Sequence, residues 1–325
     1  MPTDLSDTLV VGIAATALFD LREADALFQA CRAAEPATAL QAYRQHMLER
    51  EREPLADGTG MALARALLGL NRFQSPGDPC ALVEVVVLSR NSPETGLRVL
   101  HAIRERALPI VRHAFTGGKS VVDYLEAFSV DLFLTTNPSD AQRVIDSGLC
   151  ASALLKPPPH EGQPPPEDQV RIAFDGDAVL FADASELVYK QQGLATFQAQ
   201  EDACSDQPLA DGPYAQFLRK LARLQQRLPF ALEESPLRLA IVTARSAPAE
   251  LRVIHTLRHW GVTVNELFFL GGVAKTRVLQ AFRPHIFFDD QDIHLEPAAA
   301  SVPAGRVPYR SDSPLHAMNQ PPDQP

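Results

Sequence analysis

The sequence predicts an α/β fold built on a parallel, Rossmann-like sheet. Short apolar runs alternate with helical stretches through the 325 residues, and such runs are typical of strands covered by helices on both faces. Apolar residues make up 46% of the chain, which is enough for a large core. A shift of 154 residues also aligns the two halves of the chain, which predicts two similar lobes.

The first lobe is expected over residues 1–156. The run Leu9–Phe19 follows Asp4 and Asp7 rather than basic residues, and it is too short to span a bilayer, so we expect a buried strand and neither a signal peptide nor a membrane contact. The expected elements are strands at Thr8–Ile13, Leu82–Leu88 and Leu132–Thr135, and a helix at Pro93–Glu105.

Proline triplets at Pro157–Pro159 and Pro164–Pro166 predict an extended linker over residues 157–169. The second lobe is expected over 170–310, and the polar, proline-rich stretch 311–325 is expected to be disordered. The elements expected in the second lobe are strands at Val170–Phe174, Leu237–Val242, Glu266–Leu270 and Ile286–Phe288, and helices at Pro248–Trp260 and Lys275–Phe282.

The similarity of the halves is clearest in one five-residue segment. Pro54-Leu55-Ala56-Asp57-Gly58 recurs as Pro208-Leu209-Ala210-Asp211-Gly212. At the same shift, 13 of the 52 positions from Ser89 to Asp140 are identical to their counterparts. The constant shift favours an internal duplication of one α/β unit over two unrelated lobes of similar composition.

Two carboxylates, Asp175 and Asp177, follow the apolar strand that ends at Phe174. Side chains two residues apart in an extended segment point the same way, toward the crevice where open α/β sheets bind ligands. Like charges so close need a cation or a shared proton. Asp175 could bind a hard divalent cation and attack phosphorus, and Asp177 could transfer protons. Alone, such a pair could equally cap a helix or form a turn.

Three further signals follow later strands. The Thr243 hydroxyl could bind a phosphate oxygen or cap the next helix. Lys275, at the start of a helix, could offset phosphate and carboxylate charge, although alone it would be read as a surface lysine. Asp289 and Asp290 could hold a metal or cap a helix. Together with Asp175 and Asp177, the set indicates a magnesium-dependent phosphohydrolase.

The order of these signals resembles the four motifs of the haloacid dehalogenase-like hydrolases. That resemblance implies a sheet of this type, Asp175 as nucleophile, Asp177 as acid and base, and Mg²⁺ bound by the first carboxylate, the carbonyl of the second and the last acidic pair. Asp289 and Asp290 remain alternatives for the direct ligand. We place the substrate at Thr243, Ala244, Arg245 and Lys275, and the metal at Asp175, Asp177, Asp289 and Asp290.

A closer resemblance, from about Leu9 to Tyr309, is to the cytosolic 5'-nucleotidase I family. The stretches that carry it are LVVGIAATALFDL, VVLSRNSPETGLRV, AFTGGKS, FDGDAVLF, TARSAPAELRVI and FFDDQDIH. It implies a cytoplasmic enzyme that hydrolyses nucleoside 5'-monophosphates, AMP prominently, with Mg²⁺. The residues alone leave two alternatives: a phosphatase for another small phosphate ester, or a nucleotide-binding regulator with little activity.

The first lobe lacks the catalytic residues. Ile13 and Ala15 stand where the second lobe has Asp175 and Asp177. The other counterparts are Ser89 for Thr243, Val121 for Lys275, and Thr135 and Thr136 for the acidic pair. We therefore expect this lobe to support the sheet, to dimerise or to close over the nucleotide, and homo-oligomer formation stays open. Its polar segments Ser89–Ser92 and Thr116–Lys119 could hold a nucleotide or simply form turns and caps.

Residues 186–227, between the first two motifs, are expected to form a helical cap that shields the site. Four aromatic residues of this region are candidates to stack on a base or to pack in the core, and none is singled out. They are Phe181, Tyr189, Phe197 and Tyr214.

Charge and cysteine content exclude other classes. The formal net charge of −10 disfavours nucleic-acid binding, because the surface repels phosphate backbones. The four cysteines form no CxxC pair, so we expect free thiols in a reducing cytoplasm.

Overall fold

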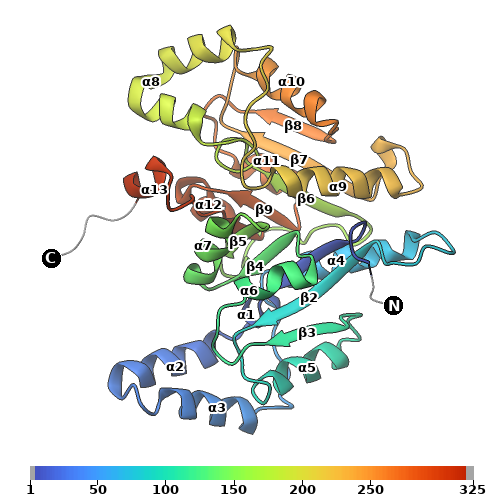
Figure 1. Cartoon of the computed structure of the whole chain (residues 1–325), viewed down its shortest axis with the longest axis vertical. Coiled ribbons are helices and arrows are strands. Elements are labelled where there is room, and N and C mark those ends of the chain that lie inside the picture. The colour runs from blue at the N-terminus through green and yellow to red at the C-terminus, as the bar shows by residue number, and fades with distance from the viewer. Residues whose placement is uncertain (1–3, 320–325) are drawn as a thin grey trace.

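The computed structural model describes residues 4–319 and contains one ten-stranded sheet. The strand order is β3-β2-β1-β4-β5-β10-β9-β6-β7-β8, and Figure 1 shows the sheet running from β8 at the top to β3 at the bottom. The strands are β1 (Leu9–Ile13), β2 (Val83–Ser89), β3 (Arg112–Phe115), β4 (Leu132–Thr135), β5 (Ala151–Leu155), β6 (Val170–Phe174), β7 (Leu237–Thr243), β8 (Glu266–Phe269), β9 (Ile286–Asp289) and β10 (Ala304–Arg306).

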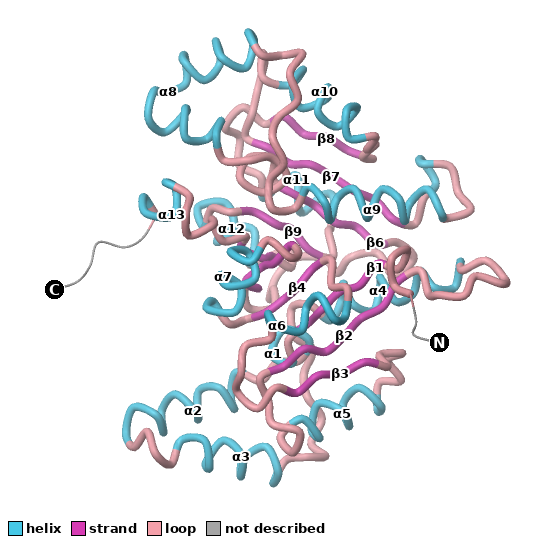
Figure 2. Tube along the Cα trace, viewed as in Figure 1, coloured by secondary structure: helices cyan, strands magenta, loops and turns pink. Residues whose placement is uncertain are grey.

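Helices connect the strands and pack against them (Figure 2). The first half has α1 (Ala15–Leu18), α2 (Arg22–Ala34), α3 (Ala39–Glu49), α4 (Met61–Gly69), η1 (Leu70–Phe73), α5 (Gly96–Glu105), α6 (Val122–Leu125), η2 (Glu126–Phe128) and α7 (Pro138–Ser147). The second half has α8 (Ala184–Ala203), α9 (Ala215–Arg227), η3 (Leu232–Glu234), α10 (Glu250–Trp260), α11 (Thr276–Phe282), α12 (Asp292–Ala299) and α13 (Pro314–Met318).

The two halves meet at one antiparallel strand pair. β5 pairs with β10 antiparallel, whereas every other pairing between neighbouring strands is parallel. From either edge inward the order is equivalent: β3-β2-β1-β4-β5 from one side and β8-β7-β6-β9-β10 from the other. The hairpin of α2 and α3 and the long helix α8 project near opposite ends of the sheet (Figure 1).

The repeated five-residue segment forms the same local structure in both halves. Phe19 bridges Asp57 in the first half, and Phe181 bridges Asp211 in the second. The backbone hydrogen bonds match as well: Gly58 N to Leu18 O and Asp20 N to Ala56 O, both at 2.9 Å, correspond to Gly212 N to Leu180 O at 2.8 Å and Ala182 N to Ala210 O at 2.9 Å. In each half, the repeated segment is therefore hydrogen bonded to the turn that follows the half's first strand.

Each half also covers part of the other's sheet. Helix α4 of the first half contacts β6, and helix α9 of the second half contacts β1. Near these helices, the Phe73 and Phe230 rings meet edge to face with centroids 4.9 Å apart. Most of the buried apolar side chains of both halves therefore belong to one large cluster, and two smaller clusters in the second half lie apart from it.

The structure confirms a mixed α/β fold with a mostly parallel sheet, and all the expected strands are present. Strands β3, β5 and β10 were not predicted. β3 contains the polar pair Arg112-His113, and β10 has only three residues. Its Gly305 allows close approach to β5, because an added Cβ would lie 3.0 Å from the Ala153 Cβ.

Two expectations from the sequence need correction. The predicted cap over 186–227 does not hold for α9, which buries Phe217, Leu218 and Leu221 in the main core, so only α8 projects. The predicted disorder over 311–325 does not hold for residues 311–319. They contain α13, because Leu315 is fully buried and the Ser311 hydroxyl donates to Asp146 Oδ2 at 2.7 Å. Residues 320–325 lie outside the described part of the chain.

Residues 157–169 form no helix or strand, and they lead from β5 to β6 along the end of α12, where His160 N and Glu161 N both donate to Ala300 O. All four cysteines are free thiols, as expected. Among residues 4–319, none of the helices combines the length and the apolar character needed to cross a membrane.

We expect Gly212→Ala to destabilise the protein. An added Cβ would lie 2.4 Å from Phe181 O and 2.6 Å from Val179 O, and neither backbone atom can move without disturbing the repeated turn. The free energy of unfolding should fall by roughly 2–3 kcal/mol, measured by urea denaturation. The matched control is Gly69→Ala, where nothing lies within 4 Å. Equal stability of the two variants would contradict this account.

Candidate active site

Three carboxylates meet where two neighbouring strands end. Asp175 directly follows β6, Asp289 ends β9, and Asp290 comes next. β6 and β9 are paired in register through Phe174 and Phe288, so their carboxyl ends lie at the same edge of the sheet. One oxygen from each acid lies within 4.8 Å of the others, and all three residues are buried.

Lys275 lies between two of these acids. Its Nζ is 2.8 Å from Asp175 Oδ1 and 2.7 Å from Asp289 Oδ2, and the side chain is 1% exposed. Burial acts to lower the pKa of Lys275, but the two carboxylates outweigh it and the pKa is raised. The lysine is therefore a fixed positive charge inside the cluster, not the surface residue that it would be taken for alone.

Burial raises the pKa of Asp175 to about 6, against the opposing effect of Lys275. Burial likewise raises the pKa of Asp289, and burial together with neighbouring acids raises that of Asp290 well above its ordinary value. These directions share one main cause, which is the burial of the three carboxyl groups away from water.

The two acids of the last motif differ in their hydrogen bonds. Asp289 uses both oxygens, with Oδ2 on Lys275 and Oδ1 accepting from Gln291 N at 2.8 Å. Asp290 Oδ2 accepts from the Tyr309 hydroxyl, and its buried Oδ1 has no hydrogen-bond partner among residues 4–319. A buried acceptor without a partner is costly, so Asp290 Oδ1 is the atom of this pair that fits a metal ion.

The side chain of Asp177 does not belong to the group of three acids and pairs with an arginine. Arg245 Nε and Nη2 donate to Asp177 Oδ2 and Oδ1 at 2.8 and 2.6 Å. On its other side, Arg245 Nη1 donates to Glu201 Oε2 at 2.5 Å, and both side chains are 1% exposed. Glu201 Oε1 accepts from Ser185 Oγ at 2.8 Å and from Arg252 Nη1 at 2.9 Å. Both carboxylate oxygens of Asp177 are thus occupied by Arg245.

Thr243 ends β7 beside the loop that carries the first two acids. The residue is buried, and a Cβ added to Gly176 would lie 3.2 Å from Thr243 Oγ1. Glycine at 176 therefore leaves room at this hydroxyl for a ligand. Ala244 is exposed and has no polar side-chain atom, so it can offer only its backbone amide to a phosphate.

The site has fewer positive than negative side chains. Six carboxylates lie in or near the cluster and only four cations pair with them, so the acids outnumber the cations by two. The carboxylates are those of Asp175, Asp177, Glu186, Glu201, Asp289 and Asp290, and the cations are Lys190, Arg245, Arg252 and Lys275. Oxygen ligands of this kind suit a hard cation such as Mg²⁺.

A model of the 5'-nucleotidase family matches residues 1–314. The chain belongs to the 5'-nucleotidase family. It is also 33% identical over 304 residues to human cytosolic 5'-nucleotidase 1B, an alignment that covers 91% of this chain and 48% of the human protein. The chain thus spans about half the length of that relative. No solved structure matches the chain significantly.

Sequence reasoning missed three residues of this 5'-nucleotidase family site. Glu201 and Glu186 lie in α8, whose residues show little amphipathic pattern to mark one face as special. Glu186 Oε1 accepts from Gln291 Nε2 at 3.0 Å, and its Oε2 is buried without a hydrogen-bond partner in the described chain. Tyr309 follows β10, a strand too short to predict, so no signal marked its position.

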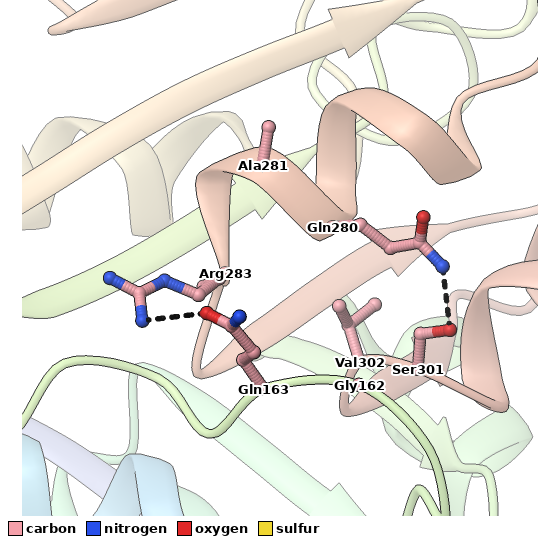
Figure 3. Close-up of a pocket in the computed structure, with 7 residues that line it drawn as sticks. All are labelled: Gly162, Gln163, Gln280, Ala281, Arg283, Ser301 and Val302. Atoms are coloured by element: carbon pink, nitrogen blue, oxygen red, sulfur yellow. Dashed lines mark hydrogen bonds between the residues drawn. The ribbon is translucent and has the colours of Figure 1, made fainter.

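A separate hollow of about 480 Å³ lies at the opposite ends of the strands (Figure 3). Its walls come from the linker, the end of α11 and the turn before β10, where Gln280 Nε2 donates to Ser301 Oγ at 2.9 Å. None of the predicted site residues lines it. The acidic cluster, not this hollow, is therefore the candidate active site.

We expect Glu201→Gln to lower the free energy of unfolding by about 3 kcal/mol, because it removes one partner of a buried charge pair and leaves Arg245 and Arg252 short of a carboxylate. Urea denaturation measures the change. Asp202→Asn is the matched control, since it removes the same charge from an exposed position on the same helix. If Glu201→Gln were as stable as that control, the buried ion pairs of Glu201 with Arg245 and Arg252 would not stabilise the fold as described.

Proposed function

We propose that the protein is a magnesium-dependent 5'-nucleotidase that hydrolyses nucleoside 5'-monophosphates, AMP among them, to nucleoside and phosphate through an aspartyl-phosphate. One observation carries the proposal: a buried, cation-deficient cluster of Asp175, Asp289 and Asp290 lies beside Asp177. Family membership and the similarity to human cytosolic 5'-nucleotidase 1B support the substrate class.

In this proposal Asp175, Oδ1 of Asp290 and the backbone carbonyl of Asp177 would hold Mg²⁺. The unpartnered Asp290 Oδ1 favours this residue over Asp289, whose oxygens are already engaged. When bound, the cation would neutralise phosphate and carboxylate charge and so let an anionic ester approach an anionic nucleophile.

Asp175 would attack the phosphorus, forming an Oδ–P bond while the bond from phosphorus to the ester oxygen breaks. Gly176 N and Lys275 Nζ both lie on Oδ1, at 2.7 and 2.8 Å, which favours Oδ2 as the attacking atom. Thr243 and Lys275 would hold the phosphoryl oxygens. Asp177 would give its proton to the leaving oxygen, then take one from the water that attacks phosphorus and releases Asp175.

Arg245 has a second role in this scheme beside the expected contact with substrate. Its two-point pairing with Asp177 fixes the carboxylate at the edge of the cluster, and a planar guanidinium suits such a bidentate contact. Arg245 therefore orients the acid and base, and its contact with phosphate remains a proposal.

We also assign the fold to the haloacid dehalogenase type with α8 as its cap, and infer that it arose by internal duplication. The equivalent strand order and the matched turns at Asp57 and Asp211 support the duplication. The first half would be non-catalytic, because Ile13 and Thr135 replace acids of the second half. The free thiols and the name of the human relative support a cytoplasmic location.

We expect Asp175→Asn to lower phosphate release by at least about a thousandfold, because an amide cannot form the acyl-phosphate. The control is Asp140→Asn, which changes a buried acid in the first turn of α7, in the first half, and should keep activity within about twofold. If activity survived Asp175→Asn, or disappeared in Asp140→Asn, the proposal that the second half carries out the chemistry would be wrong.

The substrate class is tested by phosphate release from AMP, IMP, GMP, CMP, UMP and their deoxy forms, with ribose 5-phosphate for comparison. We expect nucleotides to react fastest, and EDTA to stop the reaction until excess Mg²⁺ is added. Equal rates with EDTA would exclude the metal role, and faster hydrolysis of the sugar phosphate would exclude a nucleotidase.

We expect Mg²⁺ to raise the melting temperature more at pH 7.5 than at pH 5.5. Burial raises the pKa of Asp175 to about 6, so the metal-free folded protein loses stability as pH rises from about 4 through 6, where the unfolded chain is already ionised. At pH 7.5 the Asp175 carboxyl has lost its proton, so less proton competition opposes the metal there than at pH 5.5. A Mg²⁺ concentration of 100 times the Kd would then stabilise the folded protein by about 2.7 kcal/mol.

Thermal unfolding with and without Mg²⁺ measures this shift. Asp290→Asn should abolish most of it, whereas Asp292→Asn, a partly exposed acid paired with Lys156, should keep it. A shift of the same size at both pH values would mean that Mg²⁺ binds outside the buried cluster.

A further inference from the structure

The proton donor shows on which side of the site the nucleoside must lie. In the proposed reaction Asp177 protonates the oxygen that joins phosphorus to the nucleoside. The nucleoside therefore extends from the cluster past Asp177, toward the side where Arg245 and helix α8 lie. A residue that recognises the base should be found along this direction, with a free surface to offer.

Of the four aromatic candidates, three have no ring face to offer. Phe181 and Tyr214 are fully buried, and Phe197 is 8% exposed. Tyr214 packs on Phe174 and Phe288 in the core. Tyr189 is 52% exposed, so only its ring among the four can receive a flat ligand.

Short contacts lead from Asp177 to this ring. The Arg245 guanidinium, which binds Asp177, lies 5.4 Å from the centre of the Phe197 ring. The Phe197 ring meets the Tyr189 ring edge to face at 6.2 Å. The Phe197 ring thus lies between the Arg245 guanidinium and the Tyr189 ring and contacts both. The ribose and base of a nucleotide are long enough to extend from Arg245 to Tyr189.

The backbone of α8 produces this meeting of two rings. Gly193 has φ 82° and ψ 175°, which interrupts the helix, and a side chain would be strained there. Eight residues of unbroken helix would separate Tyr189 and Phe197 by about 12 Å along the axis. The break brings the rings together, with Phe197 as a buried support behind Tyr189.

The segment that carries Tyr189 is also held against the site. Lys190 Nζ lies 2.7 Å from Glu186 and 5.8 Å from the centre of the Tyr309 ring. Glu186 in turn binds Gln291, next to the acidic pair. Because residues three and four apart share a helix face, Tyr189 lies on the same side of α8 as Glu186, the side that faces the site.

We infer that Tyr189 is the residue against which the nucleobase stacks, which makes it a specificity-determining residue for the proposed nucleotidase. The inference rests on the proposed function. A heteroaromatic base would cover the exposed part of the ring, beside the path that leads to Asp177, and purines should gain most because they offer more area.

The test compares kcat/KM for AMP and for ribose 5-phosphate, which keeps the phosphate and sugar but lacks the base. Tyr189→Ala should lower the AMP to ribose 5-phosphate ratio roughly 5- to 150-fold, mainly through the KM for AMP. Tyr189→Phe should restore the ratio, because stacking needs the ring and not the hydroxyl. Tyr124→Ala, at a tyrosine 41% exposed in the first half, should leave it unchanged.

Binding of AMP to Asp175→Asn protein, with and without Tyr189→Ala, provides the same comparison without turnover. An unchanged ratio in Tyr189→Ala, or an equal loss in Tyr189→Phe, would overturn the inference. Wild-type protein that hydrolyses both substrates equally well would also overturn it but leave a phosphatase. Wild-type protein that releases phosphate from neither would instead refute the proposed function.

Discussion

The need to bury several carboxylates at one sheet edge shapes the second half of the molecule. Charges in a low-dielectric interior are tolerated only when paired, and each nearby element supplies part of the pairing. Lys275 bridges Asp175 and Asp289, backbone amides bind one oxygen of each, and the Tyr309 hydroxyl reaches Asp290. In the proposed function the acids that no cation pairs with would bind a divalent cation, so affinity for the metal and the cost to the fold would have the same origin.

The two halves have the same arrangement of strands, but only the second half buries several carboxylates at the sheet edge. Their strands follow the same order, and both contain the turn made by the repeated segment. At the ends of β1 and β4, however, Ile13 and Thr135 occupy positions that need no cation. The first half therefore keeps the architecture without the electrostatic cost, which is the pattern expected where only one half carries the chemistry.

Sequence predicted the strand-end acids well, because the period of a strand and the parallel order of the sheet fix where they lie. It could not predict the partners of these acids. Arg245 was expected at the substrate, yet it pairs with Asp177 and with Glu201, 44 residues earlier in a helix without a clear apolar face. Strand β10 was missed because three residues carry no periodicity, and α9 was taken for a cap although its apolar face packs in the core.

The exchange of helices between the halves has a consequence for the size of a minimal enzyme. Since α4 covers β6 and α9 covers β1, removing the half without catalytic residues would strip apolar cover from the strand that carries Asp175. It would also leave β10 without its antiparallel neighbour, a bare edge open to pairing with other chains. The first half thus helps to keep the strand that precedes Asp175 covered and paired, so we expect the second half alone to be less stable and more prone to aggregate.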